Sequence, residues 1–121
     1  MNWWDLLIVF GIVAAFLLYR RAGLISVKDA KQYLRSGALV IDVRTAGEFV
    51  AGHLPVAVNL PLSEIETNWT RRIKDKEQVL LLHCQSGTRS SAAKKKLIAM
   101  GCPNAYNMGG YTRAARIVKG K

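Results

Sequence analysis

One cysteine of this chain stands where a thiol can act as a nucleophile. Cys84 follows the apolar run QVLLLH (78–83) and precedes the short polar loop QSGTR (85–89). A tight loop between a strand and a helix turns its backbone N–H groups toward its own centre, and the helix N-terminus adds partial positive charge. We expect this setting, with Arg89 nearby, to lower the pKa of the Cys84 thiol and make it nucleophilic at neutral pH.

The loop residues suit the binding of an anion or of a single sulfur atom. Gly87 allows a backbone conformation that a side chain would block, and Ser86 and Thr88 carry hydroxyl donors. Most free cysteines are small buried side chains, and this alternative stays open for Cys84. The side chain of His83 should point to the opposite face of its strand, where a packed histidine is more usual than a catalytic base.

Alternating helical and strand patterns must position this loop. Helices are predicted at 26–37, with Ser26 as N-cap, at 63–72, with the capping pair Ser63 and Glu66, and at 90–101. Strands are predicted at 38–43, around Val58, at 78–83 and at 104–108. This alternation predicts an α/β fold in which helices cover a central, mainly parallel sheet. Ligands of such sheets bind at the carboxyl ends of the strands, where Cys84 lies.

The first twenty residues predict a separate membrane segment. Residues 6–19 carry no charge, and aromatic residues flank them, as they do at membrane interfaces. With Trp3 and Trp4 the stretch is about 17 residues long, the lower limit for a bilayer core of roughly 30 Å. We therefore expect a transmembrane anchor at 1–20 and a globular domain at 21–121. A cleaved signal peptide and a buried N-terminal helix are the alternatives.

Basic residues follow the apolar run and none precedes it. The positive-inside rule then predicts a single-pass protein at a membrane, with the C-terminal domain on the cytoplasmic side. Gly11 and Ala15 have the spacing that lets two membrane helices approach closely, so a homo-oligomer formed through the anchor is a further expectation.

The composition restricts the partners. Eighteen Lys and Arg residues against eight Asp and Glu residues give a formal net charge of +10, which favours anionic partners such as acidic lipid or small anionic substrates. Lys94, Lys95 and Lys96 have no interleaved aromatic residues, so we expect a solvated helix face and no nucleic-acid binding. Two cysteines are too few for a disulfide framework.

Three stretches, taken in order, resemble the rhodanese-like (sulfurtransferase) family. These are IDVRTAGEFVAGHLPVAVNLPLSEI (41–65), HCQSGTRS (83–90) and YNMGGY (106–111), and the resemblance extends over about residues 24–116. It implies the rhodanese-like fold and a thiosulfate sulfurtransferase type of activity. In that reaction a sulfane sulfur passes from a small anionic donor, such as thiosulfate or a persulfide, to a thiol or to cyanide.

The resemblance also implies roles for individual residues and no metal or organic cofactor. Cys84 would be the nucleophile that carries the sulfur as a persulfide, held by the backbone of Gln85, Ser86, Gly87, Thr88 and Arg89. Arg89 would either bind the anionic donor or form a structural ion pair with Glu48. Asp42 and Arg44 would support the site from the end of a neighbouring strand, while His53 and Asn59 would make structural hydrogen bonds.

Three other functions compete with this interpretation. Cysteine-based phosphatases and arsenate reductases, which share the fold, have five residues between cysteine and arginine, whereas four stand between Cys84 and Arg89. A membrane-tethered binding module without turnover would not need the thiol. A redox pair of Cys84 with Cys102 is excluded, because the predicted helix between them holds the two residues too far apart for a disulfide.

Overall fold

The computed structural model describes residues 2–120, and within them four parallel strands form one sheet in the order β2-β1-β3-β4. The strands are β1 (Leu39–Asp42), β2 (Val58–Asn59), β3 (Leu80–His83) and β4 (Ala105–Gly109). In the register of the two central strands, Asp42 pairs with His83. Parallel strands all end at one edge of the sheet, so the residues that follow β1, β3 and β4 lie together there.

Helices cover both faces of this sheet, as the sequence pattern predicts. Helices α4 (Ile65–Arg72) and α5 (Thr88–Ala99) pack on one face, where Ile41, Leu82 and Leu97 are among the buried residues. Helices α2 (Val27–Arg35) and α6 (Tyr111–Lys119) pack on the other, beside α3 (Ala46–Ala51), where Val40 and Leu81 are buried. Neighbouring residues of one strand thus enter opposite cores, and the predicted α/β fold is confirmed.

Local hydrogen bonds explain where the helices begin. The Ser26 side chain caps α2 by accepting the N–H of Asp29, as predicted. The capping pair predicted at Ser63 and Glu66 is wrong: a 3-10 turn, η1 (Leu62–Glu64), precedes α4, whose N-cap residue Glu64 makes no side-chain cap bond. Pro61 comes directly before this turn, and its fixed φ and missing N–H favour a tight local turn over a side-chain cap.

Two helices that the sequence pattern does not predict lie at the edge of the sheet that carries Cys84. The first is α3, whose six residues are too few to show a helical period, although Thr45 and Glu48 form a complete capping box before it. The second is α6, which begins directly after the glycines at the end of β4 and packs against α2. Both helices supply residues near the loop that follows β3.

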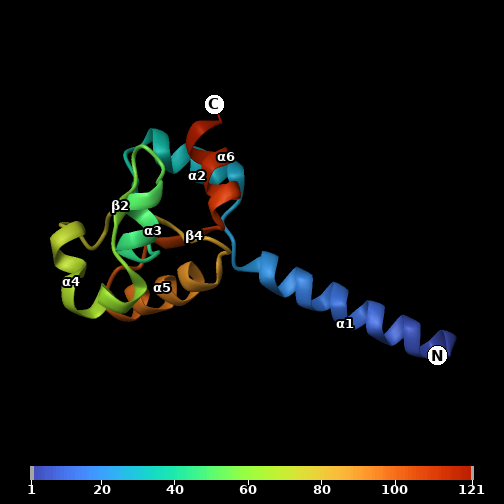
Figure 1. Ribbon diagram of the computed structural model, residues 1–121. Coiled ribbons are helices and arrows are strands. Elements are labelled where there is room, and N and C mark those ends of the chain that lie inside the picture. Colours follow the sequence, from blue (N-terminus) through green and yellow to red (C-terminus); the bar gives the residue numbers. More distant parts are fainter. Residues whose placement is uncertain (1, 121) are drawn as a thin grey trace.

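The structure does not support the predicted transmembrane span. The N-terminal residues form a helix, α1 (Trp3–Ala22), which extends away from the domain (Figure 1). Its large apolar side chains, such as Trp3 and Phe10, are exposed. Within residues 2–120, no helix is both long enough and apolar enough to cross a membrane. The uncharged run 6–19 is about 21 Å long as a helix, shorter than a bilayer core of roughly 30 Å. The predicted domain boundary after residue 20 and the pairing of two such helices stay predictions.

Candidate functional site

Cys84 lies directly after β3, beneath the loop that leads into α5. Its side chain is fully buried, and its sulfur accepts the backbone N–H of Gly87 at 2.9 Å. Burial alone would raise the pKa of this thiol, but hydrogen bonds from the Ser90 hydroxyl and from the N–H groups of Ser90, Gly87 and Ser86 outweigh burial and lower the pKa. The loop therefore favours the thiolate, the reactive form of cysteine.

The end of β4 fixes the conformation of this loop. Gly87 has a φ of +94°, in the left-handed region, and a Cβ atom there would lie 3.4 Å from the backbone of Gly109. At Gly110 the space is tighter still, because a Cβ atom would lie 2.7 Å from the carbonyl oxygen of Gln85. The same oxygen accepts the N–H of Tyr111 at 3.1 Å. The two glycines thus let β4 run against the loop, backbone to backbone.

Ser90 and Asn107 are two buried polar residues of the site that the sequence pattern does not indicate. The Ser90 hydroxyl lies 3.5 Å from the Cys84 sulfur and 2.7 Å from the side-chain oxygen of Asn107. The Asn107 amide group in turn donates to the carbonyl oxygen of Gly87 at 3.3 Å. Ser90 lies on α5 and Asn107 on β4, and the two residues are far apart along the chain. Their spacing in the sequence therefore does not reveal the contact.

Arg89 points to Glu48 and forms the ion pair that was one of its two expected roles. Its two terminal nitrogens donate to the two carboxylate oxygens at 2.6 and 3.0 Å. The Arg89 guanidinium, and after it the N–H of Thr45, lowers the pKa of Glu48 to about 2. The pair joins α5, which follows the loop, to α3. Binding of a substrate by Arg89 stays a prediction.

Asp42 and Arg44 form a buried ion pair at the end of β1. The Arg44 guanidinium contacts the Asp42 carboxylate at 2.7 Å and also donates to the Gly52 carbonyl at 2.7 Å. Its remaining nitrogen lies 3.4 Å from the side-chain oxygen of Gln85, and the guanidinium lies 4.9 Å from the centre of the Tyr111 ring. The guanidinium of Arg44 is thus held by Asp42, Gly52 and Tyr111, while its Nη1 faces Gln85 of the cysteine loop.

The other residues named from the sequence lie around this pair. His83 is fully buried on the face of the sheet opposite to Cys84, and its Nδ1 lies 3.2 Å from the carbonyl oxygen of Cys84. Its Nε2 lies 3.7 Å from the Asp42 carboxylate and has no hydrogen-bond partner among the described residues. The Asn59 amide group donates to the carbonyl oxygens of Asp42 and Arg44 at 3.0 Å each, the expected structural role. His53 makes the expected loop hydrogen bond, to the carbonyl oxygen of Phe49 at 2.9 Å.

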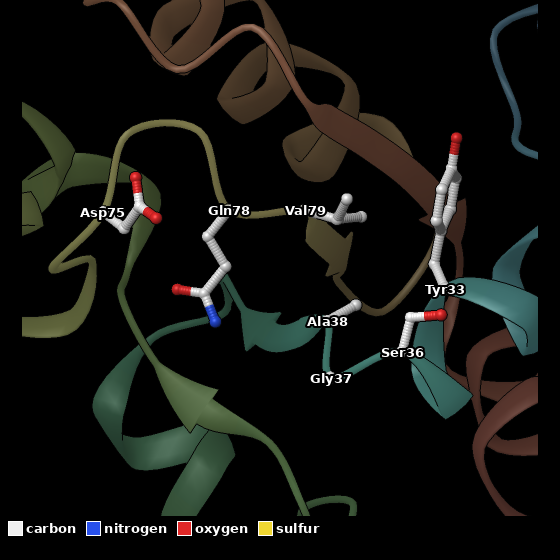
Figure 2. Close-up of a pocket in the computed structure, with 7 residues that line it drawn as sticks. All are labelled: Tyr33, Ser36, Gly37, Ala38, Asp75, Gln78 and Val79. Carbon is white, nitrogen blue, oxygen red and sulfur yellow. The ribbon is translucent and has the colours of Figure 1, made fainter.

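Two pockets of comparable size lie in the described part of the chain, and one of them adjoins this site. It measures about 290 Å³, and its lining residues include Arg44, Glu48, Gln85 and Tyr111. The other, of about 340 Å³, is lined by Tyr33, Gly37, Gln78 and others around the amino ends of β1 and β3 (Figure 2). Of these two pockets, the one lined by Arg44 and Gln85 is next to the cysteine loop. The other lies at the far end of the sheet, because the amino ends of parallel strands lie opposite their carboxyl ends.

Cys102 lies beyond the C-terminal end of α5 and is separate from the site. Both cysteines are free and buried, and burial raises the pKa of the Cys102 thiol. Among the described residues, no three His, Cys, Asp or Glu side chains lie close enough together to hold a metal ion.

Comparison with known proteins gives relatives over most of the chain. A Bacillus subtilis (strain 168) protein, YqhL, described as uncharacterized, is 34% identical over 124 residues, which cover 95% of this chain and 97% of its own. The thiosulfate sulfurtransferase PspE of Escherichia coli (strain K12) is 33% identical over 70 residues, 58% of this chain and 67% of its own.

Two solved structures have the same fold. The human single-domain sulfurtransferase TSTD1 has a TM-score of 0.67 at 28% identity and covers 78% of this chain and 96% of its own. A rhodanese from E. coli, solved with anions, has a TM-score of 0.60 at 30% identity and covers 64% of this chain and 91% of its own. The family model described as rhodanese-like domain matches residues 26–115. The chain therefore belongs to the rhodanese-like family, whose members include sulfurtransferases.

Proposed function

We propose that the protein is a sulfurtransferase that carries a sulfane sulfur on Cys84 as a persulfide. The observation that supports this best is the Cys84 sulfur beneath its loop, 2.9 Å from the N–H nitrogen of Gly87 and 3.5 Å from the Ser90 hydroxyl. A sulfur atom held by such donors is favoured as the thiolate, which is the attacking form. Sulfurtransferases among the relatives and the solved structures support the same class of reaction.

The proposed reaction has two displacement steps. The Cys84 thiolate attacks the outer sulfur of thiosulfate, a new S–S bond forms, and the old S–S bond breaks with its electron pair leaving on sulfite. A thiophilic acceptor, cyanide or a thiolate, then attacks the outer sulfur of the persulfide. The bond to Cys84 breaks, its electron pair returns to the Cys84 sulfur, and the thiolate is restored.

The enclosure of Cys84 restricts the donor. The cysteine side chain is fully buried, whereas Gln85, Ser86 and Thr88 are exposed on the outer side of the loop. A donor must therefore present its sulfur at the tip of a narrow group, and the loop must move outward as that sulfur enters. Thiosulfate and a small persulfide both have a terminal sulfur, and the N–H groups of the loop favour their negative charge.

The Arg89 contacts argue against phosphoryl transfer. A cysteine-based phosphatase needs its loop arginine to bind the phosphate oxygens through two parallel N–H···O hydrogen bonds. Here both terminal nitrogens of Arg89 donate to Glu48, so the guanidinium is directed to that carboxylate. The shorter spacing between Cys84 and Arg89 also leaves a smaller loop, and we therefore favour sulfur as the atom transferred.

Intact-protein mass spectrometry tests the proposed function. The reduced full chain is incubated with thiosulfate or with glutathione persulfide, and one added sulfur atom, removable by cyanide, is the expected product. The variant Cys84→Ser should gain none, whereas Cys102→Ser, which changes the other free cysteine, should gain it as the native chain does. No gain of sulfur from either donor would overturn the proposal and favour a binding module.

We also propose that α1 attaches the domain to a membrane, with the domain on the cytoplasmic side. Its large apolar side chains are exposed, among them Trp3 and Trp4 at 69% and Phe10 at 73%. So many exposed apolar side chains on one helix are unusual for a surface that meets only water. The B. subtilis relative matches 95% of this chain, so the likeness includes much of this N-terminal segment.

Vesicle flotation tests the attachment. The full chain should float with phospholipid vesicles, and Phe10→Glu should weaken flotation because it places a charge on the apolar helix. Val50→Glu is the matched control, since Val50 is 81% exposed but lies on α3 of the domain. Attachment through α1 would be contradicted if all three proteins floated equally, or if none of them floated.

Protease treatment of bacterial spheroplasts tests the side of the membrane. External protease should leave the domain intact if it lies on the cytoplasmic side, and digestion of the domain would place it outside.

A further inference from the structure

The buried hydroxyl of Ser90 lies between a sulfur atom and several oxygen atoms that compete for its single proton. Its oxygen is 3.5 Å from the Cys84 sulfur and 2.7 Å from the side-chain oxygen of Asn107. The carbonyl oxygens of Gly87 and Gly109 lie 3.1 and 3.5 Å away. A serine hydroxyl has one proton to donate, so the bond it makes depends on which of these atoms attracts that proton most.

The side chain of Asn107 keeps its hydrogen bonds when this proton turns away. Its side-chain oxygen also accepts the N–H of Gly109 at 2.8 Å, and its amide group donates to the carbonyl oxygen of Gly87 at 3.3 Å. Turning the Ser90 hydroxyl away from Asn107 therefore leaves no buried side-chain oxygen without a donor, and this makes the rotation inexpensive. A hydroxyl that can rotate at low cost can respond to charge on the sulfur.

We propose that Ser90 is a catalytic residue whose hydroxyl turns from Asn107 to the Cys84 sulfur when that sulfur becomes negatively charged. The rotation itself depends only on the charge of the Cys84 sulfur, whereas its part in sulfur transfer rests on the proposed function. Hydrogen bonds to a charged atom are stronger than those between neutral groups, so the thiolate outcompetes the amide oxygen of Asn107, and the neutral sulfur does not.

Ser90 then acts in the step that releases the sulfur. In the persulfide, the negative charge resides on the outer sulfur, the inner Cys84 sulfur is neutral, and the hydroxyl donates to Asn107. When the acceptor attacks the outer sulfur, the S–S bond breaks and its electron pair moves onto the Cys84 sulfur. The Ser90 hydroxyl and the Gly87 N–H stabilise this developing charge, and no proton leaves Ser90.

The charged groups near Cys84 are largely engaged elsewhere. Arg89, on the helix that carries Ser90, pairs with Glu48, and this ion pair raises the pKa of the Arg89 guanidinium. At the ends of β1 and β3, the charged or titratable side chains near the site are Asp42, Arg44 and His83. The first two pair with each other, and burial lowers the pKa of His83, which favours its uncharged form. Among the hydrogen bonds described above, the side-chain donor nearest to the Cys84 sulfur is the Ser90 hydroxyl.

The variant Ser90→Ala tests the proposal in the full chain. Alkylation of Cys84 by iodoacetamide, located by peptide mass, should slow about tenfold at neutral pH, and its pH profile should move to higher pH. Ser91→Ala, the neighbouring serine of the same helix, is the matched control and should react as the native chain does. Ser90→Thr keeps the hydroxyl and should restore most of the native profile.

Release of sulfur gives a second measurement. Native protein and Ser90→Ala are loaded with one sulfur atom, and the transfer to cyanide is followed in a single turnover, which should be about tenfold slower in the variant. If a folded Ser90→Ala protein keeps the native pH profile of Cys84 alkylation, the proposal is overturned, even if sulfur transfer becomes slower. The slower transfer would then reflect a structural role of Ser90, since such a role does not change the alkylation profile. Alkylation needs no sulfur donor, so this result is independent of whether the native chain accepts sulfur.

Nuclear magnetic resonance of the native protein tests the same rotation if Ser90→Ala does not fold. The side-chain amide signals of Asn107 should shift with pH at the midpoint at which Cys84 ionises, because the hydroxyl leaves Asn107 at that point. Signals of Asn107 that stay constant while Cys84 titrates would overturn the proposal.

Discussion

Arg89 and Glu48 join the helix that follows the cysteine loop to the short helix that follows β1, through two hydrogen bonds of 2.6 and 3.0 Å. Both side chains are about one-third exposed, so water screens the pair and its contribution to stability is small at neutral pH. The main effect of the pair is to hold the C-terminal side of the cysteine loop in position against α3.

The Arg89 and Glu48 pair predicts a specific response to acid. The pKa of Glu48 is lowered from 4.5 to about 2, so the folded state binds this proton less readily than the unfolded chain does. The stabilisation is therefore fully present above pH 4.5 and is lost as the pH falls toward about 2. Urea unfolding at several pH values should show a weaker loss of stability below pH 4.5 in Glu48→Gln than in the native chain. Glu77→Gln, an exposed control, should retain the native dependence, and equal slopes for all three proteins would contradict the prediction.

The buried pair of Asp42 and Arg44 should matter far more for stability. Arg44→Met leaves a fully buried carboxylate without its guanidinium, and breaking a buried ion pair in this way costs about 3–5 kcal/mol. The free energy of unfolding in urea should fall by that amount. Lys96→Met breaks the exposed pair with Glu66 and should have little effect. A similarly small loss for both variants would show that Asp42 does not depend on Arg44.

The sequence predicts the strands and the cysteine loop because both rest on local patterns. Runs of apolar residues indicate β1 and β3, and the position of Cys84 after the second run indicates the edge of the sheet at which it lies. The contact of Ser90 with Asn107 joins elements that are distant along the chain, so no local pattern reveals it. The expectation that His83 faces away from Cys84 is correct because successive strand residues point to opposite faces.

The N-terminal helix shows the opposite situation. Its helical character follows from composition, but whether its apolar surface enters a membrane depends on length and charge together. The uncharged run ends before Arg20, and this charge limits the apolar length of α1. The average hydrophobicity of the segment does not show this limit.

His83 predicts a second dependence on pH, in a higher range. Burial lowers the pKa of His83 from its ordinary 6.5, and the nearby Asp42 carboxylate only partly opposes this. The unfolded chain therefore binds this proton more readily, so stability is highest above pH 6.5 and falls as the pH drops below that value. His83→Gln should remove this part of the dependence in urea unfolding between pH 7.5 and about 5. His53→Gln, at the exposed histidine, is the control, and a native slope in His83→Gln would contradict the prediction.

Gly110 offers the sharpest test of how the end of β4 holds the loop. A methyl group at this position would lie 2.7 Å from the carbonyl oxygen of Gln85, so Gly110→Ala must push the loop and β4 apart. We expect a loss of about 1–3 kcal/mol in the free energy of unfolding, together with a loss of the hydrogen bond from Tyr111 to Gln85.

Gly47→Ala is the matched control for this substitution. Gly47 lies in α3, and apart from its chain neighbours and the backbone of its own helix no described atom lies within 4 Å of the position its Cβ would occupy. Alanine there should leave the stability unchanged or raise it slightly, since alanine favours helix over glycine. Because Gly110→Ala disturbs the loop itself, the alkylation rate of Cys84 should change with it, whereas Gly47→Ala should retain the native rate. A Gly110→Ala protein with native stability and a native alkylation rate would show that β4 does not hold the loop.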